Sequence, residues 1–560
     1  MRGRHPLRDE TRGRRRATLS PVQIPSWQRG FRPQPAPDCS RFGRDAQKAP
    51  EVLIIGAGPT GLVLALWLSR IGVGVRIIDR TTGPGTNSRA LAVQARTLEL
   101  YRQLDLADAV VAQGHKVPAV NLWTKGERAA RVDFSTVGTG LTRYAFLEIF
   151  PQDEHERLLI ERLRAFGVVV ERQTELLTFS DDGAGITARL RKPDGREETC
   201  KASYLAGCDG ASSTVRKALG IGFAGGTYHD IFYVADIEGS GPTINGELHV
   251  DLDEADFLAV FPLAGTGRAR LVGAISDVRL HEGEGLTFAD IGTRVIEQLK
   301  IDVAQVNWFS TYHVHHRIAE HFRKGRAFLL GDAGHIHSPV GGQGMNTGIL
   351  DAINLAWKLA AVLSDRAGDS LLDSYEPERM GFARRLVATT DRAFSFVTAD
   401  GRLASVIRTR IAPTVLSGVF AFKPAREFLF RTVSQITLNY RDMALSAGRA
   451  GDVAGGDRLP WVSIDGTDNH TDNHEPLQRT AWQVHVYGTA SHALSAWCRA
   501  HDIPLHAFAW QPAYGQAGLA RDALYLIRPD TYVALAEASG DPDSIDRYFA
   551  ERQIRPGEDR

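Results

Sequence analysis

The stretch Glu51-Val-Leu-Ile-Ile-Gly-Ala-Gly-Pro-Thr-Gly61 decides the fold of this chain. It begins with a short apolar run rich in β-branched residues, which is typical of a buried parallel strand. Three glycines follow in the spacing GxGxxG, and residues Leu62–Leu68 then continue with helical character. A second strand-like run, Val73–Ile78, ends at Asp79-Arg80. Strand, glycine turn, helix, strand and acid in this order predict a βαβ unit that binds a dinucleotide.

Each residue type in this unit has a physical role. Gly56 permits the tight turn, Gly58 lets the backbone approach a pyrophosphate, and Gly61 lets helix and strand pack closely. The start of the helix supplies unpaired N–H donors and the positive end of the helix dipole to the phosphates. Asp79, eighteen residues after Gly61, is expected to accept hydrogen bonds from the adenosine ribose, with Arg80 beside it in the same site. This motif alone does not distinguish FAD from NAD.

Length and composition limit the classes of protein to which this chain can belong. At 560 residues the chain has room for three or four domains of roughly 150 residues each. Its apolar content of 43% and charged content of 24% are ordinary for a soluble globular protein. The net charge is zero, so no global electrostatic argument favours nucleic acid as a partner. No apolar run reaches the roughly 18 residues that a membrane-spanning helix needs.

The first 48 residues differ from the rest. They hold twelve basic and four acidic residues and lack apolar periodicity, so we expect a disordered basic arm that carries no chemistry. No apolar run follows Arg14-Arg15-Arg16, which argues against a twin-arginine signal, whereas a mitochondrial presequence stays an alternative. The cysteines form no CxxC pair, which argues against a disulfide framework, a zinc site and a dithiol redox centre and favours reduced thiols in the cytoplasm (Cys39, Cys200, Cys208 and Cys498).

Two further short motifs follow apolar strands. Asp209-Gly210 comes after Tyr204-Leu-Ala-Gly-Cys208, and Arg216 stands seven residues beyond Asp209. Gly331-Asp332 comes after Arg326-Ala-Phe-Leu-Leu330. The run His337-Ser-Pro-Val-Gly-Gly-Gln-Gly-Met-Asn346 then leads into a predicted helix from about Thr347 to Leu363, whose apolar residues repeat at helical spacing.

With these three motifs in this order, the sequence resembles the group A flavoprotein monooxygenases, which include para-hydroxybenzoate, phenol and polyketide hydroxylases. The resemblance covers roughly residues 50–400. It implies an FAD extended across the first domain, with NADPH or NADH bound only transiently as co-substrate. The chain agrees with this, because it has no second GxGxxG after a strand.

The resemblance also implies roles around the flavin. Asp332 would bind the ribityl chain, and the backbone from Gly341 to Asn346 would face the N1–C2 edge of the flavin, which includes Gly342, Gly344 and Met345. A helix start at this edge would stabilise the anionic reduced flavin by up to about 2 kcal/mol. Pro339 would lie beside C4a, so the catalytic candidates are Pro339, Gly342 and Asn346.

Further residues are assigned by the same resemblance, each with an alternative. Arg89 would lie near the adenosine and pyrophosphate, and Gln152 near the isoalloxazine ring, although both could be surface residues. Asp209 and Arg216 would join the cofactor site. His335 and His337 are better explained as packing or hydrogen-bonding residues than as bases. Four neighbouring polar aromatic residues lack metal-ligand spacing, so we assign no metal (Tyr312, His313, His315 and His316).

The implied reaction is the hydroxylation of a phenolic or polyaromatic substrate. NAD(P)H would reduce the flavin, dioxygen would add at C4a, and the hydroperoxide would give its distal oxygen to an electron-rich ring in a site that excludes water. The flavin of the family is thought to swing between buried and exposed positions.

The substrate is expected between the flavin and a sheet built from about residues 225–320. Phe257 and Phe261 are candidates for its walls, with core packing as the equal alternative. Phenol hydroxylase of this family has an active-site Asp five residues before an Arg-Thr pair. Here Arg96-Thr97 is present but Leu91 occupies that position, which favours a different or more apolar substrate.

The sequence predicts that the C-terminal part forms a separate domain. Strand-like Trp482–Tyr487, a helix over 490–500 and a hairpin with Arg528-Pro-Asp530 at its tip resemble the thioredoxin-like appendage of phenol and polyketide hydroxylases. Without CxxC it should be redox-silent, serving as scaffold or as the interface of a homodimer.

We therefore predict an α/β protein with a Rossmann-like FAD-binding domain, an inserted substrate sheet, a helical segment and a thioredoxin-like domain. The expected divisions are a basic arm (1–48), a discontinuous FAD-binding domain (49–225 and 320–400), the substrate sheet (226–319), a helical connector (401–455) and the thioredoxin-like domain (456–560).

Other flavin chemistry stays open. A halogenase is disfavoured because no Trp-x-Trp-x-Ile-Pro stretch occurs. An epoxidase, a reductase and a non-catalytic flavoprotein that binds a partner are the remaining alternatives, and the long C-terminal part disfavours a quinone-pathway hydroxylase.

Overall fold

The computed structural model describes residues 49–85, 90–134, 137–251, 257–275, 287–290, 294–337, 342–385, 422–464 and 471–556. It is a mixed α/β fold with several sheets, as predicted. The predicted basic arm, residues 1–48, lies outside the described residues. Within the described part of the chain, no helix combines the length and the apolar character needed to cross a membrane.

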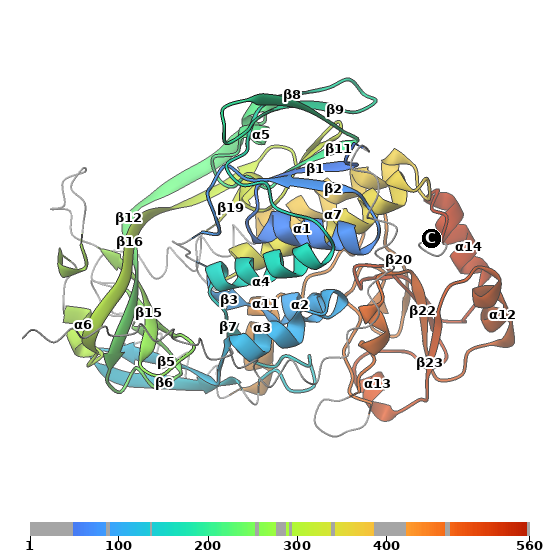
Figure 1. Cartoon of the computed structure of the whole chain (residues 1–560). Coiled ribbons are helices and arrows are strands. Elements are labelled where there is room, and N and C mark those ends of the chain that lie inside the picture. Colours follow the sequence, from blue (N-terminus) through green and yellow to red (C-terminus); the bar gives the residue numbers. More distant parts are fainter. Residues whose placement is uncertain are drawn as a thin grey trace, which may run out of the picture. The chain divides into compact units, whose positions relative to one another are not determined.

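A five-stranded sheet in the order β17-β18-β11-β1-β2 carries the three sequence motifs, with β17 alone antiparallel. Helices α1 and α7 pack together against it (Figure 1). Carboxyl ends of parallel strands meet at one edge of a sheet, so the loops after β1, β11 and β18 lie together. The bounds are β1 Val52–Ile55, α1 Pro59–Arg70, β2 Val75–Ile78, β11 Tyr204–Gly207, β17 Arg323–Lys324, β18 Ala327–Leu329 and α7 Gly344–Leu363.

Smaller elements surround this sheet. A three-stranded meander, β8 to β10, precedes β11, and a short sheet in the order β3-β7-β4 lies between the glycine turn and α4 in sequence. The sequence did not indicate either one. The bounds are β3 Ala92–Val93, α2 Ala95–Tyr101, η3 Arg102–Leu104, α3 Ala107–Gln113, β4 His115–Val117, β7 Leu147–Ile149, α4 Gln152–Ala165, β8 Glu175–Asp181, β9 Ile186–Arg191, β10 Glu197–Ala202 and α5 Thr214–Ala218.

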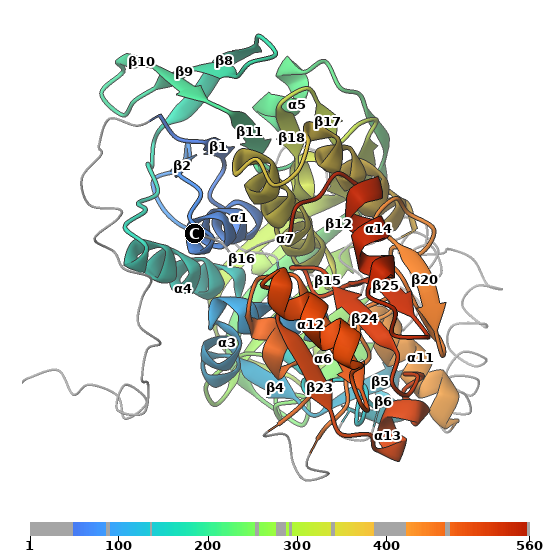
Figure 2. The ribbon, with the colours of Figure 1, turned by 90° about the vertical axis from the view of Figure 1, so that its right-hand side faces the viewer.

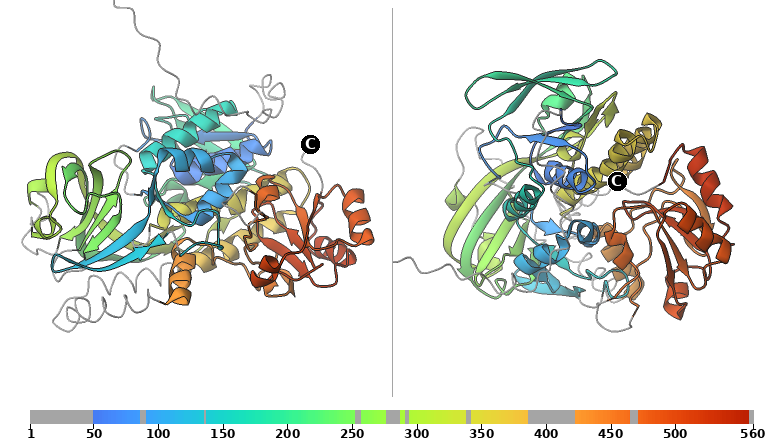
Figure 3. Two further views of the ribbon diagram at one scale, coloured as in Figure 1. Left: turned by 90° about the horizontal axis from the view of Figure 1, so that it is seen from below. Right: turned by 45° about the vertical axis from the view of Figure 1, so that its right-hand side comes forward.

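An eight-stranded sheet in the order β19-β16-β12-β15-β14-β13-β5-β6 occupies the region expected to hold substrate. Two 18-residue strands, β12 and β16, run its whole length from the five-stranded sheet outward (Figure 1), and β5 and β6 extend its far side (Figure 3). One face is covered by α6. The bounds are β5 Ala119–Thr124, β6 Glu127–Asp133, β12 Phe223–Ser240, β13 Leu248–Asp251, β14 Leu258–Pro262, β15 Arg268–Ile275, η5 Phe288–Asp290, α6 Arg294–Gln298, β16 Asp302–Ala319 and β19 His335–Ile336.

The C-terminal part forms a six-stranded sheet in the order β21-β20-β25-β24-β22-β23 (Figure 2). Strands β22 and β23 are parallel and joined by α12, whereas β24 and β25 form the expected antiparallel hairpin. Of the predicted helical connector (401–455), residues 401–421 lie outside the described residues. The bounds are η7 Asp369–Ser374, α11 Lys423–Val433, β20 Ala447–Ala450, β21 Val453–Ala454, η9 Glu475–Gln478, β22 Gln483–Tyr487, α12 His492–Ala500, β23 Leu505–Phe508, α13 Pro512–Gln516, β24 Leu524–Ile527, β25 Val533–Glu537 and α14 Asp543–Glu551.

One apolar core joins the C-terminal sheet to the dinucleotide-binding sheet. It extends from β1 and α1 through α7 to β22, β24 and α14. Trp482, just before β22, makes edge-to-face contact with Trp357 of α7, with ring centroids 5.7 Å apart. The two parts therefore share buried surface, and α7 lies at their boundary.

Candidate functional site

Close glycine contacts bring the three motifs together. A Cβ on Gly56, whose φ is +103°, would lie 2.3 Å from the carbonyl oxygen of Cys208. A Cβ on Gly61 would lie 2.1 Å from the carbonyl oxygen of Gly56. A Cβ on Gly331 would lie 2.7 Å from Oγ1 of Thr60 at the start of α1. Side chains at these positions would push the loops apart, because these contacts are far inside van der Waals distance.

Gly58 differs from its neighbours, because an added Cβ would have no atom of the described chain within 4 Å. It caps the N-terminus of α1 in an extended conformation (φ −77°, ψ 180°), and no side chain caps this helix end. The open space at the positive end of the helix is what a pyrophosphate group requires.

The acid at the end of β2 supports this turn. One oxygen of Asp79 accepts a hydrogen bond from the Ala57 N–H at 2.7 Å, and the other accepts from the backbone and hydroxyl of Thr81 at 2.7 and 2.6 Å. The Arg172 guanidinium lies 3.6 Å from the Asp79 carboxylate. Asp79 is half-buried, whereas the predicted neighbour Arg80 is exposed.

Asp209 provides a test of whether these residues fit FAD. Its Oδ2 accepts hydrogen bonds from the N–H groups of Thr214 and Val215 at 2.6 and 3.1 Å. Its Oδ1 is buried without a hydrogen-bond partner among the described residues. A buried acceptor without a donor costs about 1–3 kcal/mol, so this site calls for a donor such as a sugar or ribityl hydroxyl. The loops therefore fit FAD.

Arg216 joins the second motif to the third. Its guanidinium donates to the carbonyl oxygens of Ala333 at 2.8 Å and Ala211 at 2.7 Å, and it lies 3.8 Å from the centre of the Phe223 ring. Ala333 belongs to η6 (Gly331–Ala333), the turn that carries the exposed Asp332. Arg216 thus links the Asp209 and Asp332 loops rather than reaching out to solvent.

Helix α7 begins at Gly344, three residues before the predicted start, and no side chain caps its N-terminus. Gly344 and Met345 are its first residues, and both are half-buried. Gly342 precedes them with φ +60°, and a Cβ on it would lie 2.7 Å from Cβ of Ala92. The start of α7 therefore presents backbone N–H groups and the positive end of a 20-residue helix.

The Asn346 side chain is buried and fully hydrogen-bonded inside the protein. Its Nδ2 donates to the carbonyl oxygens of Ala92 and Gly342, both at 2.9 Å. Its Oδ1 accepts from the Gln94 N–H at 2.9 Å and the Thr97 hydroxyl at 2.8 Å. An asparagine side chain has two donors and two acceptor sites, and all are used here. Asn346 is therefore a positioning residue, and a catalytic role of its side chain has no support in this geometry.

The remaining predicted residues divide into two groups. Arg89, Pro339 and Gly341 lie outside the described residues. Gln152 begins α4, where its N–H donates to the Ala90 carbonyl at 3.1 Å and its Nε2 donates to Glu156 at 2.8 Å. This arrangement ties α4 to the segment before β3. The roles proposed for all of these residues stay predictions.

Asp351 of α7 is a residue that the sequence analysis missed. It is fully buried and accepts hydrogen bonds from the Gly331 N–H at 3.0 Å, His335 at 2.7 Å and Arg379 at 2.6 Å. Burial alone would raise the pKa of Asp351, but Arg379 and His335 outweigh burial and keep the pKa below its usual value. A lone acid within an apolar helical stripe was the available indication.

An apolar face of the eight-stranded sheet meets the start of α7. Ala92, which contacts the Gly342 position, also packs in a cluster with Leu91, Ile149, Leu248 and Leu263. Phe261 borders this cluster. Phe257 packs in a neighbouring cluster on the same face of the sheet, with Phe232, Tyr312 and others. Leu91, which stands where phenol hydroxylase has an acid, is thus part of an apolar wall.

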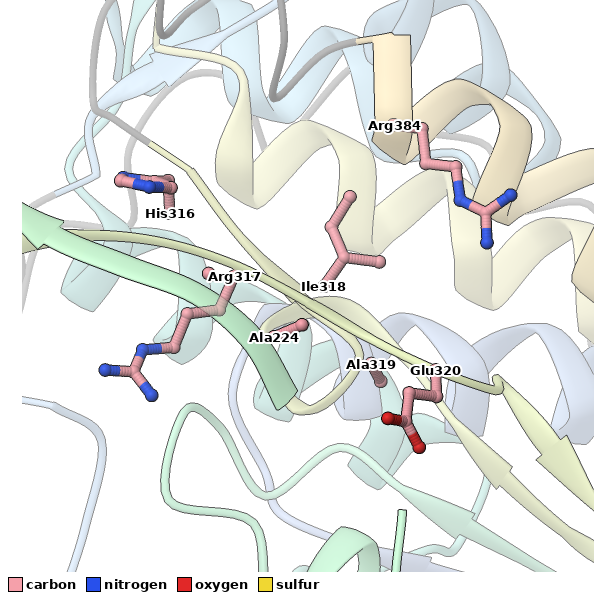
Figure 4. Close-up of a pocket in the computed structure, with 8 residues that line it drawn as sticks. Ala224, His316, Arg317, Ile318, Ala319, Glu320 and Arg384 are labelled. Carbon is pink, nitrogen blue, oxygen red and sulfur yellow. The ribbon is translucent and has the colours of Figure 1, made fainter. Parts of the chain in front are cut away.

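A cavity of about 340 Å³ lies where β12 and β16 leave the five-stranded sheet (Figure 4). Its lining includes Gly225 and Ala224 of β12, Ile318 and Arg317 of β16, and Arg384. Among the described residues of the lining, Glu320 is the one that carries a carboxylate.

Glu148 is a buried carboxyl group on β7, where its neighbours Leu147 and Ile149 belong to the apolar wall. Neither oxygen has a hydrogen-bond partner among the described residues, and burial raises the pKa of Glu148 to about 8. A group with a raised carboxyl pKa favours folding when protonated, so its contribution is lost as the pH rises from about 4.5 to about 8.

We expect Glu148→Gln to stabilise the protein on the order of 3 kcal/mol at pH 8 and to leave it unchanged at pH 4.5. Urea unfolding across this pH range measures the difference. The control is Glu161→Gln on the exposed face of α4. Parallel stability profiles for wild type and Glu148→Gln would show that this carboxyl group titrates normally.

The glycine turn, the acceptor on Asp209 and the uncapped start of α7 together define a flavoprotein of the FAD-binding class. Comparison with known proteins agrees. The family described as FAD binding domain matches residues 49–390, which is more than half of the chain. The chain is 38% identical to 6-methylpretetramide 4-monooxygenase of Streptomyces rimosus over 419 residues, which cover 72% of each protein.

Two further proteins extend this likeness. Pentachlorophenol 4-monooxygenase of Sphingobium chlorophenolicum is 32% identical over 429 residues, which cover 75% of this chain and 77% of that protein. The structure of the OxyS anhydrotetracycline hydroxylase from Streptomyces rimosus has a TM-score of 0.73 at 27% identity, covering 91% of this chain and all of that one. This chain belongs to the FAD-binding-domain family of aromatic-ring monooxygenases. The predicted FAD cofactor, NAD(P)H co-substrate and monooxygenase activity are thereby confirmed.

Proposed function

We propose that this enzyme hydroxylates a polycyclic, largely apolar phenol. The observation that carries the proposal is the contact of Ala92 with both the Gly342 loop and the apolar cluster of Leu91, Leu248 and Leu263. This contact supports the proposal, because the loop that we assign to the flavin lies beside an apolar wall that has no acid at position 91. An extended ring system gains affinity from such a wall, by about 25 cal/mol per Å² of buried apolar surface.

The chain's own residues would hold the reactants and exclude water. Gly58 and the start of α1 would receive the pyrophosphate of FAD, Asp209 and Asp332 its hydroxyl groups, and the N–H groups at Gly344 and Met345 the flavin edge. When bound, FAD supplies the chemistry that activates dioxygen. The apolar wall would orient the ring and keep water out.

The experiment begins with FAD titration of the purified protein. Phenols, naphthols, anthraquinones and tetracyclic phenols are then scored for stimulated NAD(P)H oxidation and for a product heavier by one oxygen atom. We expect the larger rings to give the higher yield of product per NAD(P)H. Failure to bind FAD would refute the assignment, and bound FAD without stimulated oxidation by any aromatic would favour a non-catalytic flavoprotein. Product formation that depends on halide would favour a halogenase.

Asp332→Ala is expected to give colourless protein that titrates with FAD only weakly, with no stimulated NAD(P)H oxidation. The carboxylate lies exposed on η6, so its removal should leave the melting temperature of the cofactor-free protein within about 2 °C of wild type. Absorption at the flavin bands measures retained FAD. Stoichiometric FAD in this variant would show that the ribityl contact lies elsewhere.

The predicted cytoplasmic location is part of this proposal, because NAD(P)H is supplied there, and the three described cysteines are free thiols. The predicted homodimer is tested by light scattering.

A further inference from the structure

The tip of the C-terminal β24–β25 hairpin, residues Arg528–Thr531, is buried against the FAD-binding part of the chain. Arg528 is 1% exposed and makes a two-pronged ion pair with Glu378, at 2.7 and 3.0 Å. It also pairs with Asp530 at 2.6 and 2.9 Å. Lys358 of α7 donates to the same Glu378 at 2.8 Å. Buried charges of the tip thus form one network with charges from two other segments, at Glu378 and on α7.

A first chain of contacts leads from this tip to the loop before α7. The Arg96 guanidinium donates to Oγ1 of Thr531 at 2.7 Å and to the Asp530 carbonyl at 3.3 Å. The next residue, Thr97, donates its hydroxyl to Oδ1 of Asn346 at 2.8 Å. Asn346 in turn holds the Gly342 carbonyl. The hairpin tip is therefore three side chains away from the loop that we assign to the flavin edge.

A second chain of contacts leads to the Asp332 turn. Arg379 follows Glu378 in sequence and donates to Asp351 at 2.6 Å and to the Thr347 carbonyl at 3.2 Å. Asp351 accepts a hydrogen bond from the Gly331 N–H at 3.0 Å. Both loops that face the cofactor are thus connected to the same hairpin tip.

Two features indicate that the hairpin tip does more than hold the C-terminal part against the FAD-binding part. Buried ion pairs are seldom more stable than apolar residues of the same size, because desolvation offsets their attraction. An apolar contact would therefore hold the two parts together equally well. Thr531, moreover, has φ +69°, a left-handed conformation that is strained for a β-branched residue. Its hydroxyl is the acceptor that orients Arg96.

We propose that the hairpin tip is a positioning element of the flavin site, which acts through Arg96, Thr97 and Asn346 on the loop at Gly342. The inference rests on the proposed function, in that this loop is assigned to the flavin edge. Thr531 and Thr97 are its positioning residues. The C-terminal part then sets how tightly the flavin edge is held and how well oxygen transfer is coupled to NAD(P)H oxidation.

The test compares Thr531→Val, Thr97→Val and Thr531→Ser with the control Tyr525→Phe. Each valine removes one hydroxyl, keeps the β-branched shape, and leaves the ion pairs intact. Tyr525→Phe also removes one buried hydroxyl in the C-terminal sheet, where it bonds to Ala450 and Ala520 away from both contact chains. The measurements are FAD dissociation constant, visible circular dichroism of bound flavin, product formed per NAD(P)H oxidised, and melting temperature.

We expect each valine variant to weaken FAD binding about three- to tenfold and to lower the product yield per NAD(P)H, as the loss of one hydrogen bond in a connected chain predicts. The double variant should be no worse than the more affected single one, because both substitutions interrupt the same chain. Thr531→Ser keeps the hydroxyl and should retain wild-type values. Tyr525→Phe should lower the melting temperature as much as the valine variants do, without changing the flavin measurements.

The inference is overturned if both valine variants match Tyr525→Phe in FAD affinity, flavin spectrum and coupling, or if Thr531→Ser behaves like Thr531→Val. Should Thr531→Val fail to fold, Thr97→Val and Thr531→Ser still decide. Wild-type protein that takes up no FAD would instead refute the proposed function, so the two failures are distinguishable.

Discussion

Gly58→Ala is expected to weaken FAD binding about 10- to 100-fold while the protein stays folded. The reason is that an extra methyl group in a well-packed site costs about 1–3 kcal/mol. In the chain itself this methyl group would meet no atom within 4 Å, and the extended backbone of Gly58 accepts any residue. Only the cofactor would meet it. Flavin fluorescence titration gives the dissociation constant, and thermal unfolding of the cofactor-free protein gives its stability.

Gly368→Ala is the matched control. Gly368 also caps a helical turn in an extended conformation (φ −72°, ψ 161°), and an added Cβ would have only ordinary contacts, at 3.6 Å. Both variants lose the small advantage of an N-cap glycine over alanine, so their melting temperatures should fall equally. Equal FAD affinity of Gly58→Ala and wild type would show that the pyrophosphate binds elsewhere.

Gly61→Leu should fail to retain FAD at all, because its Cβ would lie 2.1 Å from the Gly56 carbonyl oxygen. A yellow, folded variant would contradict the βαβ geometry.

Glu378→Ala is expected to destabilise the protein by about 3–5 kcal/mol, because it leaves Lys358 buried without its counter-charge and removes one of the two carboxylates that pair with Arg528. Burial alone would raise the pKa of Glu378, but Arg528 and Lys358 lower it to about 2. A lowered carboxyl pKa stabilises the fold above about pH 4.5, and this contribution is lost as the pH falls towards 2. The difference between variant and wild type should therefore shrink in acid.

Urea unfolding at pH 7 and below pH 4 measures this effect. The control is Asp373→Ala, which removes a surface ion pair with Arg323. The Asp373 side chain is 74% exposed, so its removal should change the free energy of unfolding by less than about 1 kcal/mol. Lys358, whose pKa burial lowers to about 8, is expected to release its proton in Glu378→Ala and so limit the loss. A loss below 1 kcal/mol for Glu378→Ala would show that water enters and replaces the missing charge.

The parts of the fold that could be predicted from the sequence are those with local patterns. β1, β11, β18 and α1 follow from apolar runs beside glycines, and the three glycine motifs lie together as their positions after parallel strands require. The predicted start of α7 is three residues late. Glycine has a low helix propensity, so Gly344 does not indicate a helical turn. The long strands β12 and β16 were not recognised as single elements, since glycines and bulges at Thr227 and Asp236 interrupt their alternation.

The candidate site shows the same division. Residues that we propose to touch a cofactor through a motif could be named, whereas the residues that hold those motifs in place could not. Arg96 and Thr531 are 435 positions apart, and Arg528 and Glu378 are 150 apart. No local pattern connects such pairs. The available indications were single charged residues in apolar surroundings, such as Asp351 and Lys358 on α7, because a charge there demands a partner.

The short edge strand β19 has a consequence for engineering this enzyme. His335 and Ile336 continue directly into the segment before α7, and they are paired through Ile318 and Arg317 to the outermost long strand of the eight-stranded sheet. Redesign near β16 would therefore also shift the segment before α7, to which we assign the flavin edge. If the apolar wall contacts the substrate as proposed, broader substrate scope is better sought on β13 and β14, beyond β15, where Val250 and Phe261 can be made smaller without disturbing the backbone that carries β19.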